Sequence, residues 1–341
     1  MLTIIQRSLL AITAVAAAGA FAAPAAKAET NLLLNHYMSA KHPMVRLVVR
    51  PWANDVAAAT QGRVKVEIPV AKITGPKKQW NSVASGTAGL SISSDSFQRK
   101  RLRLMDVGRL PFGGTTAKKT AIGLWRTYHK FIKPANIYKG VKFLSIWTPA
   151  QNVVFTRNRQ ITSADNFKGL KMRANAGLGA KGINTLGGSA VTSSGTEIFS
   201  LISKGVVDGM VFPPDGIARF KVGKYLKYAT IIPGSLYANS WSYIMNKKQW
   251  DGISSADQKA IMALSGEKMG AKGGAMFDKR GDAALANLES KEGMKKHMAS
   301  PAMMAALRKK LAPLEQDYMK DAAKKGVDGK AALAYFRSQV K

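Results

Sequence analysis

The sequence predicts an α/β protein with two lobes, each a mostly parallel sheet flanked by helices, and a ligand cleft between the lobes. Short apolar segments typical of buried strands alternate with helical segments twice along the chain, and this alternation favours parallel sheets covered by helices on both faces. A chain of 341 residues is long enough for two domains, each with its own core. Clefts between domains are preferred sites for small molecules.

The first α/β unit begins with Asn31–Asn35, a short apolar segment that we expect to form a strand. His42-Pro43 then starts a helix through Val56, whose apolar residues recur at helical spacing. Val64–Ile68 alternates apolar and charged residues, as a half-buried strand does. The remaining expected elements are a helix over Trp80–Ser85, a strand at Leu90–Ile92, a turn at Leu110–Gly114, a helix over Ala117–Ile132 and a strand over Val141–Trp147.

The second unit repeats this pattern between Phe167 and Pro214, as strand, helix, strand, helix and strand. Its first strand, Lys168–Met172, is followed by Arg173, and the carboxyl ends of strands in open α/β sheets face the ligand. A guanidinium there offers a planar set of donors that fits a carboxylate. The other expected elements are a helix over Leu178–Leu186, a strand at Ala190–Val191, a helix over Thr196–Ser203, a strand over Val206–Val211, the segment Tyr225–Ile232, a strand over Asn239–Met245, and helices over Ala256–Phe277 and Pro301–Gly326.

Residues 1–28 have the three parts of a cleaved secretory signal peptide. Arg7 supplies the positive start, Ser8–Ala23 is an apolar run rich in alanine, and Ala26-Lys27-Ala28 is a cleavage site. The run is short for a membrane span, although an uncleaved anchor is the alternative. The chain has no cysteine, which excludes disulfides, thiolate metal sites and a lipidated cysteine. These features fit a protein of the bacterial periplasm best.

The chain is strongly basic. Its formal net charge is +32, and this becomes +30 when Arg7 and Lys27 leave with the signal peptide. Such a charge often indicates polyanion binding, but the basic residues are scattered, and the tight cluster Arg99–Arg103 contains no aromatic residues that could stack on bases. We expect no nucleic-acid partner. A positive field that attracts small anions to a cleft, or a general bias of exported proteins in this species, would explain the charge.

An enzyme is the less favoured class. The sequence has no G-x-S-x-G and no H-E-x-x-H motif, and its histidines lie in no catalytic or metal-ligand spacing. We therefore predict no catalytic residues, no metal and no cofactor. His36 and His42 lie near the expected edge of the cleft, but a lone histidine is more often structural or exposed. The other two histidines are His129 and His297.

A series of short motifs resembles one family of transport proteins. The strongest is Phe167–Arg173, followed by Leu186-Gly187-Gly188 and Gly205–Gly209. In their order and spacing the motifs are similar to those of the solute-binding receptors of TRAP transporters, the tripartite ATP-independent periplasmic family. The likeness covers nearly all of the mature chain. The further motifs are His42-Pro43, Thr60–Val64, Ser85–Thr87 with Gly89-Leu90, Leu110–Phe112, Glu197, and Met245–Asp251 with Asp257-Gln258.

The resemblance implies a receptor that closes around an organic acid and delivers it to the small and large membrane subunits, without hydrolysing ATP. It also implies that Arg173, the arginine of the G-L-K-x-R motif, is the main carboxylate ligand. A carboxylate in a closing cleft needs such a partner, because an unpaired buried charge is costly; a surface arginine after a strand is the alternative. We expect the first lobe to comprise 29–150 with 239–278 and the second 151–238 with 279–341.

Two departures from the family pattern bear on the ligand. Many members have a second arginine upstream of the first, where this chain has Asn152-Val153, and Arg159 corresponds better to a structural arginine of the family. Many also have an asparagine after the V-D-G turn, where this chain has Phe212. The changes favour a monocarboxylate with an apolar or aromatic body. The predicted ligand-binding residues are Arg173, Phe212, Trp147, Asn152, Asn175 and Trp241, although each tryptophan could equally belong to the core.

The alternatives are a receptor of another uptake system, such as an ABC transporter, or an exported enzyme. Neighbouring genes for TRAP membrane subunits, as opposed to an ATPase and a permease, would distinguish the two kinds of receptor.

Overall fold

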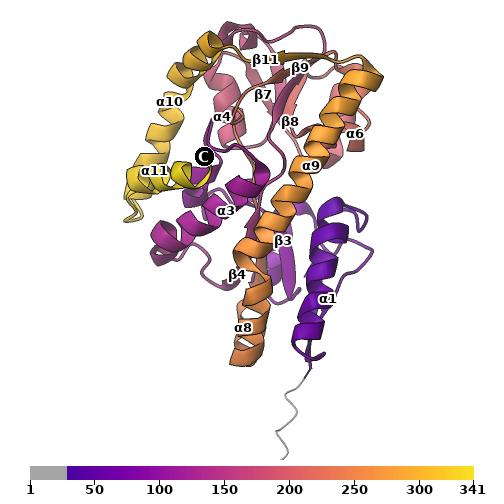
Figure 1. The fold of residues 1–341 in the computed structure, drawn as a ribbon, viewed down its shortest axis with the longest axis vertical. Coiled ribbons are helices and arrows are strands. Elements are labelled where there is room, and N and C mark those ends of the chain that lie inside the picture. The colour runs from indigo at the N-terminus through magenta and orange to yellow at the C-terminus, as the bar shows by residue number, and fades with distance from the viewer. Residues whose placement is uncertain (1–28) are drawn as a thin grey trace, which may run out of the picture.

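The computed structural model describes residues 29–341 and contains two sheets joined by crossing connections (Figure 1). The five-stranded sheet has the order β2-β1-β3-β10-β4 and the six-stranded sheet the order β11-β9-β5-β8-β6-β7. The expected signal peptide lies outside the described residues. The strands are β1 Thr30–Asn35, β2 Val64–Glu67, β3 Leu90–Ser94, β4 Val141–Trp147, β5 Val153–Thr156, β6 Lys171–Ala174, β7 Ser189–Thr192, β8 Gly209–Phe212, β9 Tyr228–Ile231, β10 Trp241–Asn246 and β11 Lys295–Met298.

Helices cover both sheets, and several are extended by short 3-10 or π turns. Within residues 29–341, no helix combines the length and the apolar character that a bilayer span requires. The α-helices are α1 Arg50–Ala59, α2 Gln79–Ala84, α3 Ala117–Thr127, α4 Leu178–Thr185, α5 Ile198–Ser203, α6 Pro214–Arg219, α7 Lys247–Gly252, α8 Ser255–Leu264, α9 Gly266–Glu292, α10 Pro301–Ala323 and α11 Gly329–Gln339.

Each sheet is mostly parallel, as the sequence predicts, with one antiparallel strand. In the first sheet β10 runs antiparallel to β3 and β4, and in the second β5 runs antiparallel to β8 and β9. Both are the strands that the chain enters on crossing from the other sheet, since β4 leads to β5 and β9 leads to β10. The two crossings place the connecting segments 148–152 and 232–240 between the sheets.

The predicted alternation is confirmed in both units, as β1-α1-β2-α2-β3 and β6-α4-β7-α5-β8. Two details differ. Arg173 lies inside β6, paired with Val191 of β7 and Met210 of β8, and does not follow the strand. The helix expected over 256–277 is two helices, because Ser265 leaves the helical conformation and Gly266 adopts a φ of +55°, where an added Cβ would lie 2.9 Å from the Trp125 ring.

The long helix α9 connects the two parts of the molecule. It contacts β4 and α3 beside the first sheet and α6 beside the second, and Figure 1 shows it running from the level of β3 and β4 to that of β8 and β9. Asp278 of α9 accepts hydrogen bonds from the backbone N–H groups of Ala117 (2.7 Å) and Lys118 (3.0 Å) at the start of α3. At Gly274 the helices approach so closely that a Cβ would lie 2.5 Å from Lys118 backbone atoms.

The carboxy-terminal helices pack across both parts. α10 contacts α4 and the 3-10 helix Arg103–Gly108, and α11 contacts α3. One buried apolar cluster accordingly includes Ile146 of the first sheet, Met172 of the second and Leu311 of α10. The residue limits of the two lobes stay a prediction.

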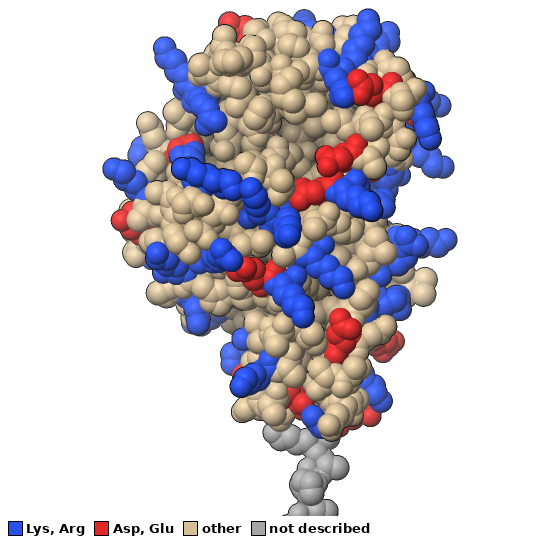
Figure 2. All heavy atoms as spheres, in the orientation of Figure 1, with Lys and Arg blue, Asp and Glu red and all other residues tan. Residues whose placement is uncertain are grey.

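Basic side chains are spread over the molecule. Figure 2 shows Lys and Arg across the whole visible face, interspersed with fewer acidic residues. On this face the charge is therefore distributed rather than gathered into one stripe, in agreement with its scatter along the sequence.

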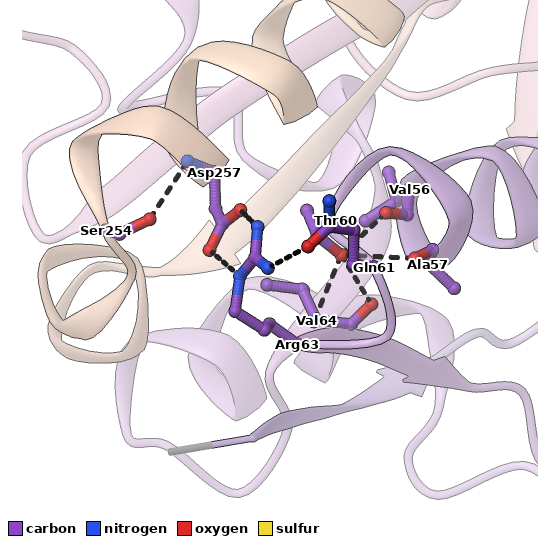
Figure 3. A network of polar contacts seen from close by, with 8 residues as sticks. All are labelled: Val56, Ala57, Thr60, Gln61, Arg63, Val64, Ser254 and Asp257. Carbon is purple, nitrogen blue, oxygen red and sulfur yellow. Dashed lines mark hydrogen bonds and ion pairs between the residues drawn. The ribbon is translucent and has the colours of Figure 1, made fainter. Parts of the chain in front are cut away.

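The Thr60–Val64 motif has a structural role (Figure 3). Arg63 donates two hydrogen bonds to the Asp257 carboxylate of α8, at 3.0 and 2.8 Å. The Thr60 hydroxyl donates to the carbonyl of Val56 in α1 at 2.8 Å, and Ser254 caps α8 by accepting from the Asp257 N–H at 3.0 Å. Because bidentate arginine–carboxylate pairs fix geometry as well as charge, this network holds the start of β2 against α1 and α8.

The contact between α3 and α9 predicts an unusual response at Gly274. Alanine normally stabilises a helix interior relative to glycine by about 1 kcal/mol. Gly274→Ala should instead lower the free energy of unfolding by about 1–2 kcal/mol, because the new Cβ meets immovable backbone. Urea unfolding would measure the change. Gly252→Ala is the matched control, since no atom lies within 4 Å of its added Cβ, and equal effects of the two substitutions would contradict the packing.

Candidate functional site

A cleft of about 1460 Å³ is lined by residues from both sheets and their connections. All six predicted ligand-binding residues line it, so the tertiary structure brings them together from β4, β6, β8, β10 and two loops. Their role toward a ligand stays a proposal. Further lining residues that the sequence analysis did not select include Tyr37, Asp215, Arg219, Asn239, Phe277 and Arg280.

Arg173 is 3% exposed and held by neutral acceptors. Its Nη1 donates to the Asn175 Oδ1 (2.9 Å), its Nη2 to the Ser193 carbonyl (2.8 Å) and its Nε to the Ser193 Oγ (3.2 Å). These bonds engage three of the five N–H donors of a guanidinium. Burial lowers the pKa of Arg173, and none of the ion pairs within residues 29–341 includes it. The group is thus a buried, oriented cation with donors to spare.

Phe212, at the end of β8, covers this guanidinium. The Arg173 Cζ lies 4.9 Å from the centroid of the Phe212 ring, a distance at which a cation is attracted to a ring face. Gly216 of α6 makes room for the ring, because a Cβ there would lie 2.1 Å from the Phe212 Cε1. Phe212, which stands where many family members have an asparagine, therefore packs on Arg173, the residue predicted to bind the carboxylate.

Tyr237 fixes the backbone around Arg173. Its hydroxyl donates to the Val211 carbonyl (3.0 Å) and accepts from the Asn175 N–H (3.1 Å), and its own carbonyl accepts from the Asn152 Nδ2 (2.8 Å). Burial raises the pKa of Tyr237. Asn152 and Asn175 thus have structural contacts besides facing the cleft. The sequence analysis missed Tyr237, which no motif distinguishes.

Stacked aromatic rings form another part of the wall. Trp147 stacks on Trp241, with centroids 4.6 Å apart, and on Phe277, with centroids 5.1 Å apart, each at an interplanar angle of 8°. The Trp241 Nε1 donates to the Tyr37 hydroxyl at 2.6 Å. Trp147 is only 2% exposed and yet lines the cleft. The two interpretations of the tryptophans, as ligand contacts or as core residues, therefore do not exclude each other. This residue is part of the core and also borders the cleft.

A second polar group of the cleft, which we call the Arg219 cluster, consists of His42, Asp215, Arg219 and Arg280. The Arg219 Nη1 is hydrogen-bonded to the His42 Nε2, and its Nη2 lies 3.6 Å from the Asp215 Oδ2. Burial, together with the charges of both arginines, lowers the pKa of His42 to about 3. Burial raises the pKa of Asp215, and the two arginines oppose that rise. His42 is therefore neutral at pH 7 and accepts a hydrogen bond from Arg219.

Among residues 29–341 no three His, Asp or Glu side chains are grouped so that they could hold an ion. What the cleft offers is two sets of cationic donors and flat apolar walls, which suit a bound organic anion.

Comparison with known proteins places the chain in one family. Residues 34–321 match the family model described as bacterial extracellular solute-binding protein, family 7. The chain is 33% identical to the protein named outer membrane transporter protein TsaT from Comamonas testosteroni. The aligned region of 317 residues covers 92% of this chain and 93% of that relative.

Two solved structures of TRAP solute-binding proteins superpose closely. One, from Bordetella bronchiseptica with (R)- and (S)-mandelate bound, has a TM-score of 0.86 and 30% identity over 91% of this chain and 98% of that one. The other, from an unidentified marine microbe and specific for aromatic acid ligands, was solved with 3-hydroxybenzoate. Its TM-score is 0.83, with 25% identity over 92% of this chain and 98% of that one.

The lowered pKa of His42 predicts a loss of stability in acid. Between the unfolded pKa of 6.5 and the folded value of about 3, the unfolded chain binds a proton that the folded protein does not, so stability falls as pH falls through this window. At pH 5 the loss due to His42 should be about 2 kcal/mol relative to pH 8. Urea unfolding at both pH values should show a smaller loss for His42→Gln. His297→Gln is the control, and an unchanged loss in His42→Gln would contradict the burial of a neutral imidazole.

Proposed function

This chain belongs to family 7 of the bacterial extracellular solute-binding proteins, the receptors of TRAP transporters, and on that premise we propose that its cleft binds a carboxylate with a flat aromatic body. In the proposed complex the Arg173 guanidinium holds the carboxylate with its remaining N–H groups. Phe212 on one side and the Trp147 and Trp241 stack on the other are the apolar surfaces for the ring.

One observation carries the proposal, namely a guanidinium that is 3% exposed, lines the cleft and contacts only neutral acceptors. A buried charge that forms no ion pair is costly, and the Glu197 carboxylate acts on Arg173 without contacting it. A bound carboxylate would offset that cost with charge-assisted, bidentate hydrogen bonds. The preference for a ring follows from Phe212, which attracts the guanidinium and lines the same cleft.

The relatives support the same ligand class. The Bordetella protein binds mandelate and the marine protein 3-hydroxybenzoate, and both ligands are carboxylates on an aromatic body. The more polar ligand classes of the wider family fit less well, because the position after the V-D-G turn carries Phe212 in this chain.

Export and partners follow from the family. We infer that residues 1–28 direct the chain to the periplasm and are removed, and that the loaded receptor docks on the small and large membrane subunits of a TRAP transporter. The family consists of solute-binding proteins, and we propose no catalytic activity. Adjacent genes for an ATPase and a permease, in place of TRAP membrane subunits, would instead favour an ABC system.

The role of Arg173 can be tested by substitution. Arg173→Ala should weaken the binding of mandelate or benzoate by about 2–5 kcal/mol, the usual cost of removing one partner of a buried charge pair. Calorimetric titration would measure the affinity, and a shift in melting temperature on saturation would report binding independently.

Arg159→Ala is the control for this experiment. Arg159 donates to the Asn166 and Lys168 carbonyls of the same part of the molecule but does not line the cleft. Binding by a folded Arg173→Ala protein as tight as that of the control would remove Arg173 from the site.

The contribution of Phe212 can be separated from that of Arg173. Phe212→Asn restores the residue common in the family and should weaken an aromatic carboxylate by about 1 kcal/mol, the worth of a typical aromatic contact. Acetate has no ring, so the substitution should weaken its binding much less. If benzoate and acetate respond equally in calorimetric competition, Phe212 does not contact the ring.

A further inference from the structure

We propose that the Arg219 cluster is a second anion-recognition site, and that the ligand carries a second oxyanion at the end of its ring away from Arg173. The inference rests on the proposed function and narrows the ligand class from aromatic carboxylates to aromatic diacids.

The two arginines of the cluster come from different elements and line the same cleft. Arg219 ends α6, which packs beside the second sheet, and Arg280 lies on α9. The charges of both act on the same imidazole, that of His42, and on the same carboxylate, that of Asp215. The helices α6 and α9 are in contact, and the His42 ring lies 6.2 Å from that of Phe277, one turn before Arg280 on α9. The two guanidinium groups therefore share one region of the cleft wall.

The cluster has an excess of positive charge. Asp215 is the one acidic residue in it, is 5% exposed, and approaches Arg219 only to 3.6 Å, beyond hydrogen-bond distance. His42 is neutral and adds no compensation. Arg280 takes part in no ion pair between the described residues. A single carboxylate thus faces two guanidinium groups that are exposed to solvent in the cleft, and their free N–H groups would pair with an oxyanion of the ligand.

The second site is separated from Arg173 by two aromatic rings. Arg173 lies 4.9 Å from the Phe212 ring centroid, the Phe212 and Phe220 centroids are 5.8 Å apart, and Arg219 lies 5.1 Å from the Phe220 centroid. Each guanidinium contacts a different ring of this pair. The two rings are tilted by 56° to each other, and a ligand ring that packs against Phe212 would present one substituent to each arginine.

The charge of the cleft agrees with a ligand that carries more than one negative charge. Only two acidic residues, Glu197 and Asp215, line the cleft. The basic residues that line it are Lys41, Arg46, Lys72, Lys77, Lys78, Arg173, Arg219 and Arg280.

The test compares one and two acid groups on the same ring. Binding of benzoate, benzene-1,3-dicarboxylate and benzene-1,4-dicarboxylate to the mature chain is measured by calorimetry at fixed ionic strength. At least one diacid should bind about tenfold or more tightly than benzoate. Arg219→Gln should reduce the affinity for that diacid at least tenfold more than the affinity for benzoate, and Arg280→Gln should act in the same direction.

Lys247→Gln is the matched control. Lys247 forms an ion pair with Asp251 at the same i,i+4 spacing as Arg219 with Asp215, but it lies outside the cleft. It removes one positive charge from the protein and should reduce the affinities for diacid and benzoate equally. Arg219→Lys keeps the charge and should retain part of the preference for the diacid. Thermal unfolding of each variant without ligand shows whether it is folded.

Diacids that bind no more tightly than benzoate would overturn the proposal, as would an Arg219→Gln variant that weakens both ligands equally. Tighter binding of 3-hydroxybenzoate than of the diacids, with the same dependence on Arg219, would show that the cluster recognises a neutral hydroxyl and would also overturn it. Failure of every aromatic acid to bind would instead contradict the proposed function. Binding of a diacid without binding of benzoate would support the second site.

Discussion

The burial of the Arg173 guanidinium, which forms no ion pair and has only the more distant Glu197 carboxylate acting on it, is the constraint to which the rest of the cleft is adapted. Three neutral acceptors and the face of Phe212 hold the group in place, yet they do not cancel its charge. Because burying a lone charge is expensive, the fold must position these partners accurately. Tyr237 does so by bonding to the backbone of Val211 in β8 and of Asn175, the residue that follows β6. A ligand carboxylate would complete the arrangement.

The aromatic wall of the cleft at Trp147 and Phe277 depends on helix packing. Asp278 of α9 caps the start of α3. Gly274 has no Cβ, and this allows the two helices to pack in direct contact. This contact sets the position of the adjacent Phe277, on which Trp147 stacks. The same helix carries Arg280 to the cleft. The aromatic wall and the second cationic group are thus positioned by one rigid element that contacts both parts of the molecule.

Much of the fold is predictable from local pattern, because alternating burial and helical spacing directly reflect which face of an element is covered. The failures have local causes. β5 is a run of only four residues, and β11 is an exposed strand of mostly basic and polar residues without apolar alternation. The break at Ser265 interrupts an apolar pattern that continues on both sides, so spacing alone suggests one helix. The placement of Arg173 inside β6 depends on its pairing with β7 and β8.

The sequence by itself determined the two-lobed α/β class, the family, and the prominence of Arg173 and Phe212, because these follow from periodicity and from short motifs in a fixed order. Only the tertiary structure decided which distant residues share the cleft. Counting back from Arg173 finds Asn152-Val153 where many members have a second arginine, whereas folding brings Arg219 and Arg280 to the same cavity. The physical reason is that spacing reports how each element is buried, while the contents of a cleft depend on how separate elements pack against one another.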